Sequence, residues 1–159
     1  MGIKSILMNK FLLAVFFFIV SCSSYSQTCE EKNDQLLMAV RSFSAATLYN
    51  TYATIGSISD GFVHKAYDAE TVIGLLDAQI KLTENLSGVF EKLLSGKIMQ
   101  SNSDSSYANG SIEILNGLKK QAQILKEYTQ NKKQKKLNEY EDQRKNNWSA
   151  ISRLMGISE

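Results

Sequence analysis

The chain lacks proline altogether, and it has only two cysteines and one histidine in 159 residues. Proline is the strongest helix breaker, so its absence allows long uninterrupted helices. A di-iron bundle needs a Glu-x-x-His motif on each of two helices, and haem attachment needs a Cys-x-x-Cys-His motif. A structural zinc site needs several cysteine or histidine ligands. With so few of these residues, we expect no metal site and no cofactor.

The balance of charge and the absence of motifs exclude further classes. The chain has 18 basic and 16 acidic residues, and removal of an export signal containing Lys4 and Lys10 would leave the two kinds equal in number. Nucleic-acid-binding proteins normally carry a basic excess, because contacts to phosphates supply most of their affinity. No glycine-rich phosphate loop, Gly-x-Ser-x-Gly elbow or His-Glu-x-x-His motif occurs. We therefore expect neither a nucleic-acid partner nor an enzyme.

The N-terminus has the order of features that is typical of a secretory signal peptide. An uncharged apolar run at residues 11–20 follows Lys10 and precedes the small residues 21–24. The run is shorter than the roughly 20 residues that span a membrane. We predict a signal peptide over residues 1–26, cleaved after residue 21 or residue 26. The first site resembles a bacterial lipobox, in which a lipidated Cys22 would anchor the protein to a membrane; the second would release it into the periplasm or medium.

Residues 27–159 are predicted to form one all-α domain, an antiparallel bundle of three long helices. Two breaks, at Gly56–Gly61 and in the Ser- and Asn-rich stretch 101–110, separate helical segments at about 30–55, 61–97 and 111–157. The middle segment has the clearest helical spacing of apolar residues, with Gly74 and Gly88 on its polar side. Asp60 is expected to cap its N-terminus.

The third segment changes character along its length, which leaves the number of helices open. Residues 126–147 are almost wholly polar, and a helix this polar is not expected to be buried. We expect it to extend beyond the core; if the chain instead folds back near 131–136, the bundle has four helices. Apolar residues return at helical spacing after this stretch, and we predict that they dock onto the bundle or onto a partner. They are Trp148, Ile151, Leu154 and Met155.

Two clusters of polar residues suggest binding or chemistry only weakly. Asp60, His64 and Asp68 are four residues apart, so on one helix they would form an acid–imidazole–acid stripe, which is our remote enzyme alternative. A capping aspartate and a solvated face explain the same residues more simply. The other cluster is a group of lysines that could meet an anionic surface, although lysines spread around a solvated helix are again the simpler interpretation. The candidates are Lys132, Lys133, Lys135 and Lys136.

Taken together, these features predict an exported, non-enzymatic helical bundle of the cell envelope that acts by protein–protein interaction or scaffolding. The expected partner is an envelope protein of unknown identity, and the oligomeric state is open. The alternative from another class is a bundle that binds a small ligand, or an inhibitor or immunity-type protein. Fold alone does not separate these functions, because helical bundles host many of them. An enclosed apolar pocket would favour the ligand, whereas a solid core with an exposed apolar strip would favour a protein partner.

Overall fold

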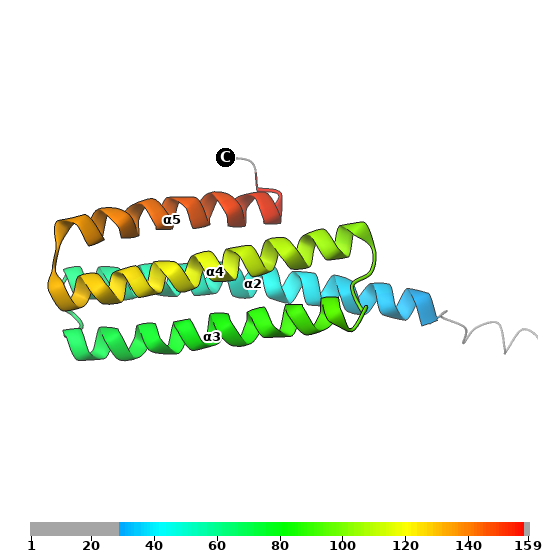
Figure 1. Ribbon diagram of the computed structural model, residues 1–159, viewed down its shortest axis with the longest axis horizontal. Coiled ribbons are helices and arrows are strands. Elements are labelled where there is room, and N and C mark those ends of the chain that lie inside the picture. The colour runs from blue at the N-terminus through cyan, green and yellow to red at the C-terminus, as the bar shows by residue number, and fades with distance from the viewer. Residues whose placement is uncertain (1–28, 158–159) are drawn as a thin grey trace, which may run out of the picture. The chain divides into compact units, whose positions relative to one another are not determined.

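The computed structural model of the protein describes residues 29–157, all of whose regular structure is α-helical (Figure 1). The predicted signal peptide, its two cleavage sites and Cys22 lie outside the described residues. The chain divides into two units, Met1–Leu36 and Leu37–Glu159, and the bundle described below belongs to the second. The helices are α2 (Cys29–Val63), α3 (Ala69–Ser95), α4 (Asn102–Asn131) and α5 (Gln134–Met155).

Consecutive helices run antiparallel, and α4 packs against α3 on one side and α5 on the other (Figure 1). Helix α2 contacts α4 through the Phe62 and Tyr128 rings, which meet edge to face with centroids 6.2 Å apart. It contacts α5 through Tyr52 and Trp148, whose centroids are 5.7 Å apart. The all-α prediction is confirmed. The prediction of three helices is wrong, and the four-helix version describes the bundle.

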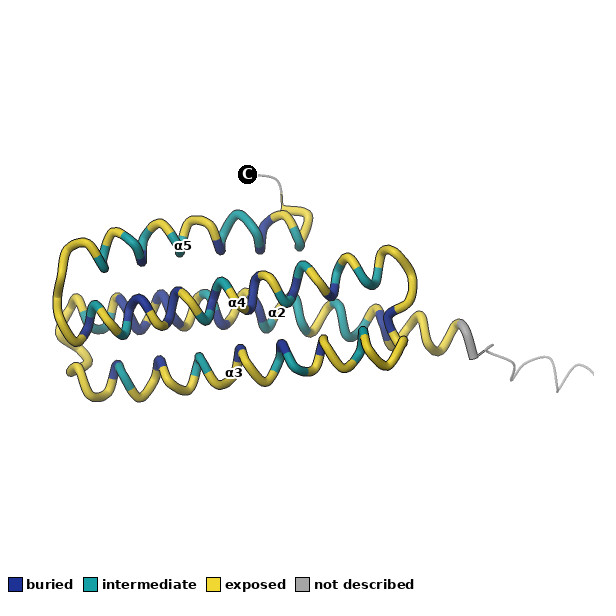
Figure 2. Tube along the Cα trace, in the orientation of Figure 1, coloured by how far each residue is buried: buried dark blue, intermediate teal, exposed yellow. Residues whose placement is uncertain are grey.

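The core centres on α4, which has buried positions along its length (Figure 2). The largest fully buried aliphatic side chains of the core interdigitate between the helices, as expected for a close-packed interior. They include Leu48, Ile55, Leu76, Leu115, Leu118, Leu125 and Ile151.

Both predicted breaks are misplaced. The glycines of the first lie in close contacts inside a helix, and a serine of the second caps the beginning of a helix. Gly56 and Gly61 lie inside α2, where a Cβ on Gly56 would lie 3.4 Å from the Arg144 guanidinium and one on Gly61 would overlap the Tyr67 ring. The first turn lies instead at residues 64–68. Ser101 caps α4, with its hydroxyl accepting a hydrogen bond from the Asp104 N–H at 3.0 Å. The stretch after Ser101 is therefore the beginning of a helix.

The polar stretch 126–147 does not extend beyond the core. Helix α4 ends where Lys132 adopts a left-handed conformation with φ of 51°, and α5 then folds back along α4. The stretch contributes the buried Tyr140 and Asn147 to the interior. The Asn147 carboxamide donates to Gln121 Oε1 at 2.8 Å and accepts from Gln143 at 2.9 Å. Hydrogen bonding between polar side chains thus allows a mostly polar helix to dock.

Candidate functional site

Helix α3 leaves an apolar stripe uncovered. Leu75, Leu82 and Val89 are exposed to 39%, 38% and 52%. Residues seven apart drift by only about 20° around a helix, so these three side chains lie almost on one line. We call this line the α3 stripe. It spans four turns of a helix whose other face already supplies Leu76 and Phe90 to the core.

The α3 stripe lies on the flank of α3 that faces away from α4. On the other flank, Asp77 pairs with Lys126 of α4 at 2.6 Å and Glu84 pairs with Lys119 of α4 at 2.7 Å. Asp77 and Glu84 each follow a stripe residue by two positions, so each lies about 200° around the helix axis from that stripe residue. Asp77 and Glu84 are thus directed to α4, whereas Glu91, which follows Val89 by two positions, is exposed without an ion pair to α4.

The outward side of α3 beside the stripe is open and carries small and basic residues. A Cβ built on Gly74 or Gly88 would meet no atom within 4 Å, so neither glycine is needed for packing inside the bundle. Lys81 and Lys92 are exposed and have no ion-pair partner in the part of the chain that the structure describes. This surface therefore combines apolar contact area, room for close approach and free positive charge.

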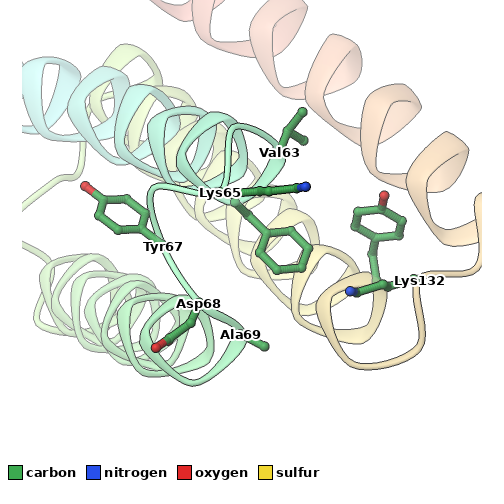
Figure 3. A pocket seen from close by; sticks show the side chains of 8 residues that line it. Val63, Lys65, Tyr67, Asp68, Ala69 and Lys132 are labelled. Carbon is green, nitrogen blue, oxygen red and sulfur yellow. The ribbon is translucent and has the colours of Figure 1, made fainter.

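The turns at residues 64–68 and 132–133 lie at one end of the bundle, which we call the turn end (Figure 1). An open hollow of about 560 Å³ lies there. Its walls include the aromatic residues Phe62, Tyr67 and Tyr128, and Lys65 and Lys132 line it from the two turns (Figure 3). One carboxylate, that of Asp68, also lines the hollow.

The four lysines predicted to meet an anionic surface are of two kinds, those near a carboxylate and those without an ion-pair partner. Lys136 forms ion pairs with Glu127 at 2.8 Å and with Glu139 at 2.7 Å, and these hydrogen bonds raise the pKa of Lys136 to about 12. Lys135 lies 4.0 Å from Glu139. Lys132 and Lys133 are exposed and have no ion-pair partner among residues 31–157. Only these two leave positive charge free to meet an anion.

The acid–imidazole–acid stripe of Asp60, His64 and Asp68, the remote alternative from the sequence, does not form. Helix α2 ends at Val63, so Asp60 lies on α2 and His64 lies in the turn. Asp68 is the N-cap of α3, the role predicted for Asp60, and its Oδ1 accepts a hydrogen bond from the Thr71 N–H at 2.8 Å. That hydrogen bond lowers the pKa of Asp68. Within the described residues, no three His, Cys, Asp or Glu side chains gather as metal ligands.

The four apolar residues near the C-terminus meet the bundle to different degrees. Trp148 is half-buried against Tyr49 and Tyr52, and Ile151 lies in the core. Leu154 packs over Gly110 of α4, and a Cβ built on Gly110 would lie 3.3 Å from the Cδ1 atom of Leu154. Met155 remains exposed. Most of this predicted patch therefore docks within the molecule, which leaves Met155 as its one residue with a large uncovered side chain.

The α3 stripe was not predicted from the sequence, although the sequence contains a signal for it. Leu75, Leu82 and Val89 recur at intervals of seven, beside the 3–4 pattern that was assigned to the core. A single helix with apolar residues on two adjoining lines can cover one line with its own bundle and leave the other free. Only the arrangement of the neighbouring helices shows which line is covered.

No helix within residues 29–157 is long and apolar enough to cross a membrane. Comparison of the chain with protein-family models, with curated proteins and with solved structures finds no match.

Proposed function

We propose that this protein is an exported, non-enzymatic interaction module of the cell envelope, which binds an amphipathic helix of a partner protein along the α3 stripe. The observation that carries the proposal is the exposure of three aligned aliphatic side chains on a helix that also supplies the buried core. Such apolar surface is costly in water, and on soluble proteins it commonly marks a binding site. Heptad spacing is the pattern by which one helix packs along another.

The charges beside the stripe indicate the kind of partner. Lys81 and Lys92 are free, whereas Asp77 and Glu84 are directed toward lysines of α4. A partner helix with acidic residues along the edge of its apolar face would therefore complement this surface. Gly74 and Gly88, where an added Cβ would meet no atom within 4 Å, leave room for the backbone of that helix to come close.

Capture of partners from a cell-envelope extract tests the interaction. We expect the tagged protein to retain one stoichiometric partner, and a Leu82→Gln, Val89→Gln double variant to retain at least about ten-fold less. Ile98→Gln is the matched control, because Ile98 is 48% exposed, close to the 52% of Val89, but lies in the α3–α4 turn. Equal recovery by the double variant would refute the role of the stripe. If the captured protein is a second copy of this chain, the partner assignment is wrong and the stripe is a dimer interface.

Export is tested separately, because it does not depend on the stripe. The intact mass of the protein recovered from cells should show that residues 1–21 or 1–26 have been removed. Loss of an added lipid mass in a Cys22→Ala variant would establish the membrane anchor. Recovery of a chain that still carries residues 1–20 would refute export.

A further inference from the structure

We propose that the hollow at the turn end binds a small amphiphilic carboxylate, with the carboxylate between Lys65 and Lys132 and the apolar body against the aromatic walls. This site is separate from the α3 stripe and goes beyond the proposed function. The hollow of about 560 Å³ falls within the range of ligand pockets, which is roughly 300–1,000 Å³. It draws on three helices and two turns, so the fold positions its walls jointly.

The positive charge in the hollow is free to bind a ligand. Among residues 31–157, neither Lys65 nor Lys132 has an ion-pair partner, whereas Lys126 and Lys136 nearby on α4 and α5 are paired. The Lys65 side chain extends from the first turn and the Lys132 side chain from the second, over the same hollow (Figure 3). Two ammonium groups from separate turns can therefore converge on one anion.

The Asp68 carboxylate does not neutralise both lysines. It accepts a hydrogen bond from the first turn of α3, and it is directed to that helix end. Two ammonium groups and one carboxylate leave a net charge of +1. A carboxylate ligand carries one negative charge at neutral pH, whereas a phosphate monoester carries between about 1.5 and 2. Charge balance therefore favours the carboxylate.

The remaining walls fit an apolar body. Phe62 and Tyr128 present an edge-to-face pair, and Val63 adds an aliphatic side chain that is largely exposed. An anion alone would leave these walls in water, while a neutral apolar molecule would leave the two lysines without a partner. A ligand with both parts satisfies the whole hollow.

The two lysines have an unusual backbone, which provides a clean experiment. Lys65 and Lys132 adopt positive φ angles of 59° and 51°, a conformation in which glycine is favoured. Replacing either lysine by glycine removes the charge and relieves the backbone, so the variant should fold at least as well as the parent. Lys97 supplies a matched control, because it has a φ of 54° but lies in the α3–α4 turn, away from the turn end.

The test is a calorimetric titration of the protein with decanoate, with decanol and acetate as probes that lack the charge or the apolar body. We expect decanoate to bind with one-to-one stoichiometry, decanol to bind at least about ten-fold more weakly, and acetate not to bind. Lys65→Gly and Lys132→Gly should each weaken decanoate binding about ten-fold, or about 1.4 kcal/mol. Lys97→Gly should leave it unchanged.

The proton signals of the single imidazole, that of His64 beside Lys65, give a second readout. They should shift on titration with decanoate in the parent and in Lys97→Gly. Absence of decanoate binding would overturn the proposal, as would binding that is as strong for decanol or that falls equally in Lys97→Gly. These outcomes leave the α3 stripe untouched, because that surface is tested by its own variants.

Discussion

Helices α3 and α5 pack against opposite sides of α4, but they use their apolar residues differently (Figure 1). The more apolar α3 places one line of side chains in the core and leaves the second, the α3 stripe, in water. The mostly polar α5 commits Tyr140 and Ile151 to the core and leaves only Met155 exposed among its large apolar residues. The polarity of a helix therefore predicts poorly how much of its surface is free to bind.

The difference arises from what each helix needs in order to dock. Helix α3 packs one of its apolar lines into the core, and two ion pairs connect its other flank to α4. Helix α5 has few apolar residues and docks with the help of hydrogen bonds from Asn147 to Gln121 and Gln143. The three side chains of the α3 stripe remain 38% to 52% exposed. This is why we place the interaction surface on α3 and not on α5.

The largest expected effect tests whether α5 depends on its few core residues. Tyr140 is fully buried, and Tyr140→Ala should lower the free energy of unfolding by about 3–5 kcal/mol, as in other large-to-small substitutions of buried aromatic residues. Leu82→Ala in the stripe should cost less than about 1 kcal/mol, because that side chain is partly exposed already. Urea denaturation of the two variants measures both values. Equal losses would remove the distinction between the two helices.

Tyr140→Phe is the control for the ring, and it adds a pH dependence. Burial raises the pKa of the Tyr140 hydroxyl above its ordinary value of 10.0. In the unfolded chain this hydroxyl loses its proton first, so above about pH 10 the unfolded state binds fewer protons and the free energy of unfolding falls as pH rises. Tyr140→Phe should keep the stability at neutral pH and lose less of it between pH 9 and pH 11. Parallel curves for the two proteins would contradict the burial of the hydroxyl.

The fold class was predictable from the sequence, but the residues at which the helices begin and end were not. The absence of proline and the apolar spacing indicated an all-α bundle, and a reversal of the chain near residues 131–136 was the alternative that gave a fourth helix. Gly56 and Gly61 resemble a helix break in the sequence, because the sequence does not show that Arg144 and Tyr67 cover them. The pairing of Asn147 with Gln121 joins residues 26 positions apart and leaves no trace in the periodicity of either helix.

The candidate sites were predictable only in part. Lys132 was identified as a residue that could meet an anion, but its combination with Lys65 and Tyr128 requires two turns to meet at one end. The Asp60, His64 and Asp68 spacing assumed one continuous helix, and the end of α2 at Val63 removed that assumption. Local spacing therefore predicts neighbours on one helix, while sites between elements depend on the packing.

A smaller effect tests the close approach of α4 and α5. A Cβ on Gly117 of α4 would overlap the Asn147 carboxamide of α5. Overpacking typically costs about 1–3 kcal/mol, and the better helix propensity of alanine recovers up to about 1 kcal/mol. We expect Gly117→Ala to lower the free energy of unfolding by about 1–2 kcal/mol in urea denaturation.

A double-mutant cycle separates this overlap from other causes. In an Asn147→Ala background the new methyl group gains space, so adding Gly117→Ala should cost nothing further. If the glycine substitution costs the same with and without Asn147, the contact between the two residues is not the reason.

The smallest expected effect concerns the surface beside the α3 stripe, and its sign is the informative quantity. A Cβ on Gly88 meets nothing within 4 Å, so Gly88→Ala should raise the free energy of unfolding by up to about 1 kcal/mol through helix propensity alone. Gly74→Ala should behave in the same way, since its surroundings are equally open. Thermal unfolding at two protein concentrations measures both. A gain at either concentration is expected for a bare surface, whereas a loss that grows with concentration would mean that a second copy packs closely against α3.

The two alanine variants can also be used in the capture experiment. If a partner helix lies close to the α3 backbone, the added methyl group should weaken binding of the partner, although it stabilises the free protein. Unchanged capture by both alanine variants would contradict the close approach and leave the aliphatic side chains of the stripe as its binding contacts.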